Sequence, residues 1–398
     1  MNIVFFSYFY EPDLSAGSFR SKSFIESLSK KLDSDDLIYV ITTHPNRYAS
    51  FIINSEDNSM VSNIVIKRIK VNQHASSIIG QFFSFYTYFI NSYLIFRKLD
   101  VDFIVCTTSR HMTGLMTAFF SLIHNKKYYV DLRDIFSETI SNLYSRKSKL
   151  IGAVLKYIFQ FLEKNVLSNA QCVNVVSESF KDYYEEIGLD TSLWTFYPNG
   201  IDKDFKLKSN VKSDKRDFKT ILYAGNLGEG QAIEDIVPKL AVILGNRYQF
   251  KIIGDGGRRK ALEKKIMKEN IANILLLDPV SRSLLINEYE DSDILFLHLN
   301  DIPAFERVLP SKLFEYAVQY KPIIGGLAGY SRDFVSNEIP HMRVFDPLDF
   351  EECAALIRES DSINIDSDSI KKFYKKYNRE VIMGEYTESI LSHQRYSI

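Results

Sequence analysis

The sequence has little cysteine, little proline and no surplus of charge. Of its 398 residues three are Cys and ten are Pro, and 49 basic side chains nearly cancel 50 acidic ones. The cysteines are far apart in apolar surroundings, which excludes a disulfide framework and a thiolate metal site and is typical of a reduced cytoplasmic protein. We expect no metal ion. The formal charge of -1 gives no general attraction to nucleic acid, so no nucleic-acid partner is expected.

Signals for export and membrane insertion are also missing. The chain begins without a basic segment, and its first apolar run is broken by Ser7 and followed by Glu11-Pro12, so it predicts a strand and not a signal peptide. Only the uncharged stretch Ile78–Phe96 is long enough to suggest a membrane span. Its interspersed polar side chains favour a largely buried helix instead.

What the sequence does contain is a pattern of short apolar runs alternating with longer stretches of helical period, and the pattern occurs twice. It predicts helices on both faces of a parallel sheet, hence an α/β protein with two doubly wound, Rossmann-like domains. The first half holds expected strands at Ile3–Phe6, Leu37–Ile41, Ile64–Ile69, Asp102–Thr107, Tyr128–Asp131 and Val173–Ser177, and helices at Ser18–Lys31, Ile78–Lys98, Met112–His124 and Leu150–Leu167. The second half holds expected strands at Thr220–Ala224, Gln249–Ile253, Ile274–Leu277, Ile294–Leu297, Pro322–Gly325 and Arg343–Phe345, and helices at Ile233–Leu244, Arg259–Glu269, Ser283–Tyr289, Ser311–Val318 and Arg332–Asn337.

The domain boundary is predicted at the turn Pro198–Gly200, which a polar, charged run follows. Residues 1–197 are therefore expected to form an N-terminal domain and residues 198–369 a C-terminal one. The segment 370–398 has helical composition without a further strand, and we expect it to pack back on the N-terminal domain. Ligands of such sheets bind beyond the carboxyl ends of the strands, so two sheets facing across a cleft would place any chemistry in the loops after strands.

Two loops of the first domain carry candidate residues. Ala16-Gly17 open a helix, where small residues let a phosphate or a sugar approach unpaired N–H donors, although an ordinary capped turn with Ser18 as the cap is the more common explanation of such a segment. Asp131, Arg133 and Asp134 crowd at the end of an apolar strand. Such charges indicate either a binding edge or an internal Arg–carboxylate network.

The second domain has glycine-rich loops after its first two strands. Asn226 lies in the first loop, and Gly254 with Arg258 lies in the second. Glycines allow close backbone approach and arginine can bind phosphate, but turns of this kind are common.

A third loop is more specific, because it ends in Pro310-Ser311, a helix start with Ser311 as the expected cap, followed by Lys312 and Glu315. A lysine beside exposed N–H donors can hold a diphosphate, and a carboxylate one turn later can accept both hydroxyls of a ribose. The alternative, a surface pair worth a few tenths of a kcal/mol, fits poorly between two apolar strands.

These segments resemble a known family. The chain is similar to GT-B fold glycosyltransferases of family 4, and in particular to the branch with N-acetyl-L-fucosamine transferases of bacterial O-antigen and capsule synthesis. The similarity runs through most of the chain, in the family's order: YFYEPDLSAGSFR, YVDLRDIFSET, VVSESF, YPNGID, YAGNLGEGQAIED, IIGDGGRRKALE and LPSKLFEYAVQYKPII.

The resemblance implies a nucleotide-sugar donor held by the C-terminal domain, an acceptor held by the N-terminal one, and transfer with retention of configuration and without an essential metal. Glu315 would then bind the ribose, Ser311 and Lys312 the phosphates, and the backbone at Pro279-Val280 the base. Ala16-Gly17 would face the donor phosphates or the transferred sugar.

The sequence departs from the family pattern at two places. Many members have two glutamates separated by seven residues, whereas eight separate Glu306 from Glu315. Many also carry Arg and Lys where this chain has Asn226 and Gln231. The positive charge that balances the donor phosphates would therefore come from Lys312, Arg307 or Arg258.

The acceptor side offers candidates only. His111 and Arg110 follow one strand, and His44 and Asn46 follow another, although a lone histidine is more often structural. In a front-face retaining mechanism the donor phosphate can accept the acceptor's proton. The residues predicted to take part in transfer are Lys312, Arg307, Asp131 and His111.

The sequence thus predicts a cytoplasmic glycosyltransferase that moves a sugar from a nucleotide-sugar, expected to be a UDP-sugar, to a polyprenyl-diphosphate-linked saccharide in O-antigen or capsule biosynthesis. Ile78–Phe96 and the basic, apolar segment Lys147–Lys164 are expected to be core helices that also make a weak peripheral contact with the membrane. A UDP-sugar 2-epimerase of the same fold and a non-catalytic sugar-nucleotide-binding partner are the alternatives.

Overall fold

The computed structural model describes residues 1–47, 55–71, 78–145, 148–207 and 217–395. Part of the predicted polar linker, residues 208–216, and Lys147 of the basic segment lie outside the described residues. The chain forms two compact units, Met1–Asn199 with Arg379–Ile398, and Gly200–Asn378. The predicted boundary after residue 197 thus lies after Asn199, and the chain returns to the first unit at Arg379, later than the predicted 370.

The first unit is built on an eight-stranded sheet in the order β3-β4-β2-β1-β5-β6-β7-β8, parallel except for the pairing of β3 with β4. Its strands are β1 (Asn2–Phe6), β2 (Leu37–Thr43), β3 (Asn58–Val61), β4 (Ile64–Ile69), β5 (Phe103–Thr107), β6 (Lys127–Leu132), β7 (Cys172–Val175) and β8 (Thr195–Phe196). The helices are α1 (Ala16–Ser29), α2 (Ile78–Phe96), α3 (Met112–His124), α4 (Phe136–Ser145), α5 (Lys149–Ser168), α6 (Ser179–Glu186) and α15 (Arg379–Arg395). The central strands are buried on both faces, as an apolar parallel sheet requires.

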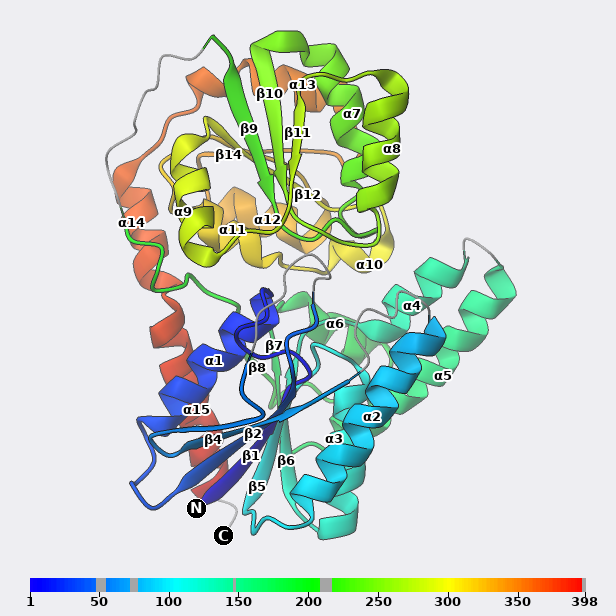
Figure 1. Ribbon diagram of the computed structural model, residues 1–398, viewed down its shortest axis with the longest axis vertical. Coiled ribbons are helices and arrows are strands. Elements are labelled where there is room, and N and C mark those ends of the chain that lie inside the picture. The colour runs from blue at the N-terminus through cyan, green and yellow to red at the C-terminus, as the bar shows by residue number, and fades with distance from the viewer. Residues whose placement is uncertain (48–54, 72–77, 146–147, 208–216, 396–398) are drawn as a thin grey trace. The chain divides into compact units, whose positions relative to one another are not determined.

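Helices cover both faces of this sheet: α1 and α15 lie on one face, and α2, α3 and α5 lie on the other (Figure 1). Helix α15 packs along α1, where the Phe24 and Tyr386 rings are 5.0 Å apart and the Ser27 and Thr387 hydroxyls are 3.1 Å apart. Helix α15 is therefore part of the first unit's core, whereas the preceding helix α14 (Ser367–Lys376) belongs to the second unit.

The second unit is a six-stranded, wholly parallel sheet in the order β11-β10-β9-β12-β13-β14. Its strands are β9 (Lys219–Ala224), β10 (Tyr248–Ile253), β11 (Ile274–Leu277), β12 (Ile294–His298), β13 (Ile323–Gly326) and β14 (Met342–Phe345). Its helices are α7 (Ile233–Leu244), η1 (Gly245–Arg247), α8 (Arg259–Glu269), α9 (Arg282–Asp291), α10 (Pro303–Glu306), α11 (Ser311–Tyr316), α12 (Gly329–Glu338), α13 (Phe350–Arg358), η2 (Ser360–Ser362) and α14. Apolar side chains such as Ile221, Phe250 and Phe296 form its core.

Every predicted strand is present, and the two parallel sheets confirm the α/β class. The sequence analysis missed short or irregular elements, among them β3, β8, α4, α6 and α13. It also made the helix at Ser311 too long, because the chain leaves the helix after Tyr316.

The prediction that Ile78–Phe96 is largely buried was wrong. Along α2 the side chains of Phe82, Phe83 and Tyr86 are 62%, 55% and 55% exposed. The hydrophobic periodicity of the sequence cannot distinguish a helix that is buried on all sides from a helix that exposes apolar side chains to solvent. None of the described helices combines the length and the apolar character that a membrane span requires.

Two glycines allow the loops after β9 and β10 to touch. Gly225 and Gly254 have φ of +154° and +156°, which side chains other than glycine rarely adopt. A Cβ on Gly254 would lie 1.8 Å from the Gly225 carbonyl oxygen, which is backbone and cannot move aside. The predicted ligand-binding glycine Gly254 is therefore explained by packing within the second unit.

Replacing Gly254 by Ala should accordingly lower the free energy of unfolding by about 2 kcal/mol or more, through backbone strain and overpacking. Gly257→Ala is the matched control, because a Cβ there meets no heavy atom within 4 Å. Urea unfolding of both variants checks the difference, and equal midpoints for the two would contradict it.

Candidate active site

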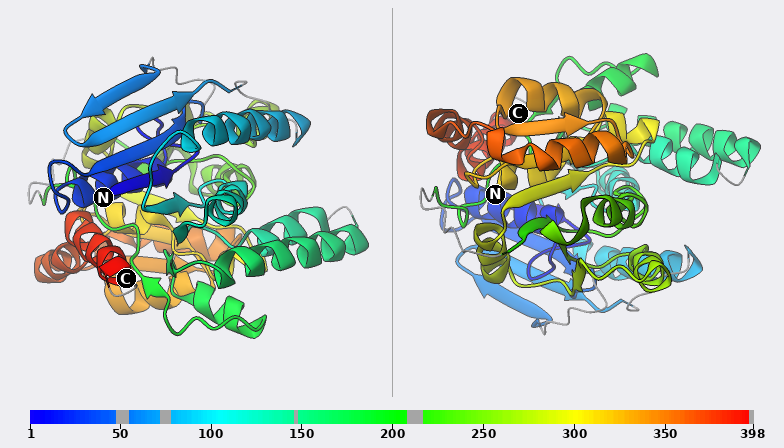
Figure 2. Two further views of the ribbon diagram at one scale, coloured as in Figure 1. Left: turned by 90° about the horizontal axis from the view of Figure 1, so that it is seen from below. Right: turned by 90° about the horizontal axis from the view of Figure 1, so that it is seen from above.

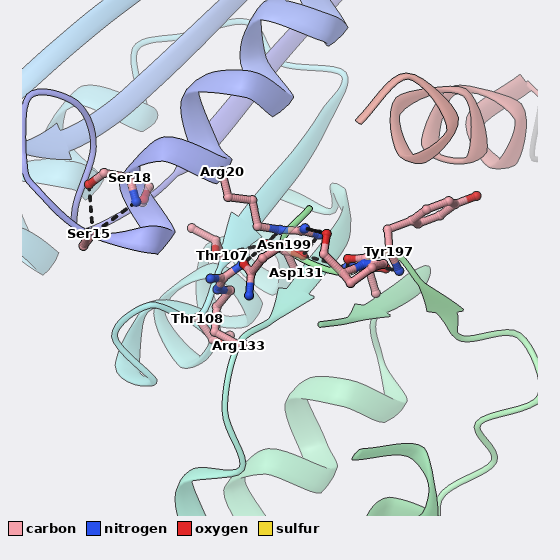
Figure 3. A network of polar contacts seen from close by, with 12 residues as sticks. Ser15, Ser18, Arg20, Thr107, Thr108, Asp131, Arg133, Tyr197 and Asn199 are labelled. Atoms are coloured by element: carbon pink, nitrogen blue, oxygen red, sulfur yellow. Dashed lines mark hydrogen bonds and ion pairs between the residues drawn. The ribbon is translucent and has the colours of Figure 1, made fainter. Parts of the chain in front are cut away.

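The carboxyl edge of the first sheet is organised by a buried ion pair between Arg20 of α1 and Asp131 of β6 (Figure 3). Arg20 donates from Nε and Nη2 to the two carboxylate oxygens at 3.0 and 2.9 Å. Asn174 of β7 donates to the same carboxylate at 2.8 Å, and Thr107 of β5 donates at 3.3 Å. Four donor groups from three elements, α1, β5 and β7, thus occupy one carboxylate.

The same network holds the chain where it leaves the first unit. Arg20 Nη1 donates to the Pro198 carbonyl at 2.5 Å, and Arg379 Nε donates to the Asn199 carbonyl at 2.8 Å. Asn174 Oδ1 accepts from the Tyr197 backbone N–H at 2.8 Å. The segment at 197–199 and the start of α15 are therefore fixed on the first unit by buried side chains.

This geometry favours a positioning role for Asp131 over the predicted catalytic one, which stays a prediction. Burial alone would raise its pKa, but the charges of Arg20 and Arg133 and the hydrogen bonds to the carboxylate outweigh burial, so the pKa is lowered. A carboxylate that is ionised, 5% exposed and already bonded to four donors positions its neighbours. It is poorly suited to accept a proton from a substrate.

Arg133, two residues after Asp131, makes fewer hydrogen bonds than Arg20. Its backbone N–H donates to Thr108 Oγ1 at 2.9 Å, while its Nη1 is 3.9 Å from Asp131 and makes no hydrogen bond to any described residue. Its side chain is only 8% exposed, and burial lowers its pKa to about 10. A guanidinium in this state remains charged and keeps donor capacity for an anion or a hydroxyl.

His111, the other predicted catalytic residue of this unit, faces inward. Its ring stacks on Phe136 with 3.9 Å between centroids, at a cavity lined mainly by apolar side chains that include Leu115 and Phe159. Burial, with a contribution from Arg110, lowers the pKa of His111 to about 3. The imidazole is therefore a weak base held by packing, which favours a structural role.

The remaining acceptor-side candidates have partners within the unit. The Arg110 guanidinium lies 4.6 Å from the centre of the Tyr8 ring, and His44 lies 2.9 Å from the Asp57 carboxylate. Ala16 and Gly17 do open α1, but the cap is Ser15, which accepts from the Ser18 N–H at 3.1 Å. The predicted cap Ser18 is buried one turn into the helix.

In the second unit, side chains brace the loop after β9. The Asn226 side chain donates to Gln231 Oε1 at 2.9 Å, and Tyr223 Oη donates to the Asn226 carbonyl at 2.6 Å. Asn300, which follows β12, donates to the Glu229 carbonyl at 2.8 Å. Asn226 and Gln231 thus stabilise the loop itself.

Arg258, one of the residues predicted to balance the donor phosphates, already has acidic partners. Its guanidinium forms ion pairs with Glu229 and Glu234 at 3.4 and 3.3 Å, so two carboxylates already balance it. Arg307 is half-buried directly after α10. Neither position resembles the setting of Lys312.

Lys312 lies against the loop after β9. Its Nζ is 5.2 Å from the centre of the Tyr223 ring, and a Cβ on Gly225 would be 2.1 Å from that atom. Desolvation lowers the pKa of Lys312 to about 8, against a smaller opposing effect of Glu315. A partly buried ammonium with a lowered pKa has much to gain from a bound anion.

Glu315 is engaged in contacts that the sequence analysis missed. Its carboxylate accepts from Arg282 Nη1 at 2.8 Å and from Tyr289 Oη at 2.9 Å, and the residue is 7% exposed. Arg282 also lies 3.5 Å from Asp202 and 4.4 Å from the centre of the Phe205 ring. A ribose diol would have to use the remaining lone pairs of Glu315 or replace one of these donors.

The segment at Pro279-Val280 leads from β11 into α9 and so places Arg282 at Glu315. Ser311 is the first residue of α11, and Pro310 holds the cap position predicted for Ser311. No local signal marked Arg282 or Tyr289, because their role depends on two helices meeting across the unit.

No family model matches the sequence. Among curated proteins, the chain is 26% identical over 171 residues to WcaI of Escherichia coli K12. WcaI is named as a colanic acid biosynthesis glycosyl transferase. That similarity covers 41% of this chain and 42% of WcaI, so the chain matches less than half the length of this relative.

Solved structures match the whole chain. Sucrose-phosphate synthase of Thermosynechococcus elongatus superposes with a TM-score of 0.77 at 14% identity, covering 100% of this chain and 99% of that one. Anabaena HepE, whose structure contains UDP and glucose, gives 0.66 at 13% identity, with 98% and 99% covered. The lipopolysaccharide outer core galactosyltransferase WaaB gives 0.61 at 14% identity, with 98% and 99% covered. The chain has the GT-B fold.

In this GT-B chain the two sheet edges differ in character. The first edge has a carboxylate fully bonded to its own unit, whereas the second carries Lys312, for which no carboxylate contact is seen among the described residues. The fold class predicted from the sequence is confirmed. The predicted roles of the individual residues remain predictions.

The Arg20–Asp131 pair gives a stability prediction. Asp131→Asn leaves a buried guanidinium without its counter-charge and should lower the free energy of unfolding by about 3–5 kcal/mol. Glu26→Gln, which removes an exposed partner of Lys22 at 3.9 Å, is the control and should cost less than about 1 kcal/mol. Denaturant unfolding measures both. If Asp131→Asn unfolded like the wild type but lost turnover, the catalytic assignment would be restored.

Proposed function

We propose that the protein is a retaining, metal-independent glycosyltransferase that transfers a sugar from a UDP-sugar to a lipid-linked saccharide during the synthesis of a bacterial surface polysaccharide. The observation that carries the proposal is the arrangement on α11. Lys312 is desolvated, so a bound anion would stabilise its charge, and the buried carboxylate of Glu315 follows one turn later. Full-length similarity to GT-B structures supports it.

The donor is assigned to the second unit. Lys312 and Ser311 would hold the diphosphate, Glu315 the ribose hydroxyls, and the backbone at Pro279-Val280 the base. The presence of UDP in the HepE structure supports uridine as the nucleoside. Arg282 would orient the Glu315 carboxylate, since it donates to one oxygen and leaves lone pairs for the ribose.

Transfer needs charge stabilisation at the leaving diphosphate more than it needs a protein nucleophile. Lys312 would supply that charge, and a donor phosphate oxygen would take the proton of the attacking hydroxyl. Arg133, whose Nη1 lacks a hydrogen bond to a described residue, is the best-placed group of the first unit to orient an acceptor. Asp131 would act through Arg20 and Asn174, which it positions.

The acceptor is proposed to be a saccharide carried on a polyprenyl diphosphate, met at the cytoplasmic face of the membrane. The names of WcaI and WaaB, which refer to colanic acid and to the lipopolysaccharide outer core, support a surface polysaccharide as the product. An N-acetylated deoxyhexosamine such as N-acetyl-L-fucosamine is the sugar class that the sequence resemblance favours.

Release of UDP that depends on an acceptor tests this function. We expect UDP to raise the melting temperature more than GDP, ADP or dTDP, with or without Mg²⁺, because a ligand that binds only the folded state stabilises it. A UDP-sugar should then release UDP only when a polyprenyl-diphosphate-linked saccharide is added. Isomerised donor without acceptor would instead identify an epimerase, and UDP binding without either reaction would identify a non-catalytic partner.

The lowered pKa of Lys312 predicts a pH dependence of donor binding. The phosphates are already ionised at about pH 7, and the affinity for UDP should fall as the pH rises from there through about 8, because Lys312 loses its proton. Lys312→Arg keeps its charge, so its affinity should not change between pH 7 and about pH 9.5. Calorimetric titration of both proteins measures this. A wild-type affinity that stays constant through that range would refute the assignment of Lys312.

A further inference from the structure

One face of the first unit exposes an unusual number of large apolar side chains. They belong to α2, α3 and α5, which lie on the same face of the sheet in both views (Figures 1 and 2). The Phe89 and Phe119 rings of α2 and α3 are 5.8 Å apart, and a Cβ on Gly114 of α3 would be 3.4 Å from Val166 of α5. The three helices thus form one layer.

Helix α5 carries the clearest stripe. Six exposed apolar side chains follow one another at spacings of one or three residues, which places them on one side of the helix. They are Leu150 (75% exposed), Ile151 (50%), Val154 (50%), Tyr157 (75%), Ile158 (46%) and Phe161 (61%). Helix α5 packs against α4 and α3. The exposed stripe is therefore separate from the side chains that bind α5 to its own unit.

The two neighbouring helices add apolar side chains to the same layer. Helix α2 exposes Phe82, Phe83, Tyr86, Ile90 and Leu94, again with helical spacing. Helix α3 exposes Met112, Phe119, Leu122 and Ile123, of which Leu122 is 81% exposed. Exposed apolar side chains gathered on three neighbouring helices mark a binding face, because isolated apolar side chains are normal but clusters are rare.

Within α2, α3 and α5 no acidic side chain points outward, although the exposed Asp100 and Asp102 follow α2. Helices α2 and α3 contain no acidic residue, and the only one in α5, Glu163, turns inward and accepts from the Phe136 and Ser137 backbone N–H groups. Basic residues lie in α5 or closely follow α2 and α3 in the sequence: Arg97, Lys98, Lys126, Lys127, Lys149 and Lys156. Apolar helix faces flanked by Lys and Arg are complementary to an anionic lipid surface.

We propose that the outer face of α2, α3 and α5, defined by the exposed apolar residues named above, docks on an anionic lipid bilayer. Phe, Tyr and Leu enter the boundary between headgroups and acyl chains, while the basic side chains meet the lipid phosphates. A second copy of this chain is a poorer occupant, because two such faces would bring like charges together. The inference specifies the membrane contact of the proposed function, but its test needs neither donor nor acceptor.

Flotation with lipid vesicles tests the docking face. The full chain should float with vesicles containing about 30 mol% phosphatidylglycerol and bind pure phosphatidylcholine vesicles at least about tenfold more weakly, because basic side chains contribute to binding only on an anionic surface. Binding should also weaken as NaCl is raised.

The variant Leu150→Asp/Phe161→Asp should reduce binding to the anionic vesicles by about tenfold or more, because two carboxylates replace apolar anchors. The matched control is Val242→Asp/Met267→Asp, which changes two side chains of the second unit that are 64% and 78% exposed. The control should float like the wild type. Melting temperatures and the UDP-induced shift, compared among the three proteins, check that all of them are folded.

Equal flotation of the α5 variant and the control would overturn the proposal, as would equal binding to neutral and anionic vesicles. If the wild type did not float but formed a dimer that the α5 variant abolished, the face would be an interface between copies, and the bilayer assignment would be wrong. Loss of acceptor-dependent UDP release with intact flotation would count against the proposed enzyme and not against the docking face.

Discussion

The first unit depends on the buried pair between Arg20 and Asp131. An isolated charge in that position would be expensive, so each must be matched by partners in good geometry. The match is made by bringing α1, β5, β6 and β7 to one point, where one carboxylate takes four donors. Since the remaining nitrogen of Arg20 holds the Pro198 carbonyl, the pair also fixes the segment through which the chain leaves the unit.

A comparable arrangement ties the second unit to its own end of that segment. Arg282 contacts both Glu315 and Asp202, and Ile201 donates its N–H to the Tyr377 carbonyl at 2.7 Å. The carboxylate proposed to bind the ribose and the residues that follow the boundary at Asn199–Gly200 therefore share one arginine. A ligand that displaces Arg282 from Glu315 would therefore also affect the contact between Arg282 and Asp202.

The sequence was sufficient for the two sheets, because apolar strands and intervening helical periods are local signals. It was also sufficient to single out Lys312 and Glu315, whose spacing and neighbours stand out. It could not assign Asp131, Gly254 or Arg258, since what distinguishes a ligand-binding charge or glycine from a structural one is its partner. Those partners, Arg20, Gly225 and the glutamates Glu229 and Glu234, lie in other loops or elements. Arg282 and Tyr289 escaped notice for the same reason.

The hydrophobicity of α2 and α5 illustrates a related limit. Composition shows that these helices are apolar, but an apolar helix can face a core, a partner or a lipid, and only the packing decides. Here Tyr88 of α2 is fully buried and donates to the Ile41 carbonyl at 2.8 Å, while Tyr86, two residues away, is more than half exposed. The same helix thus supports the sheet with one side and presents apolar rings on the other. Exposed apolar side chains lower the solubility of a protein. Their presence on three adjoining helices, none of which directs a carboxylate outward, therefore indicates a binding surface.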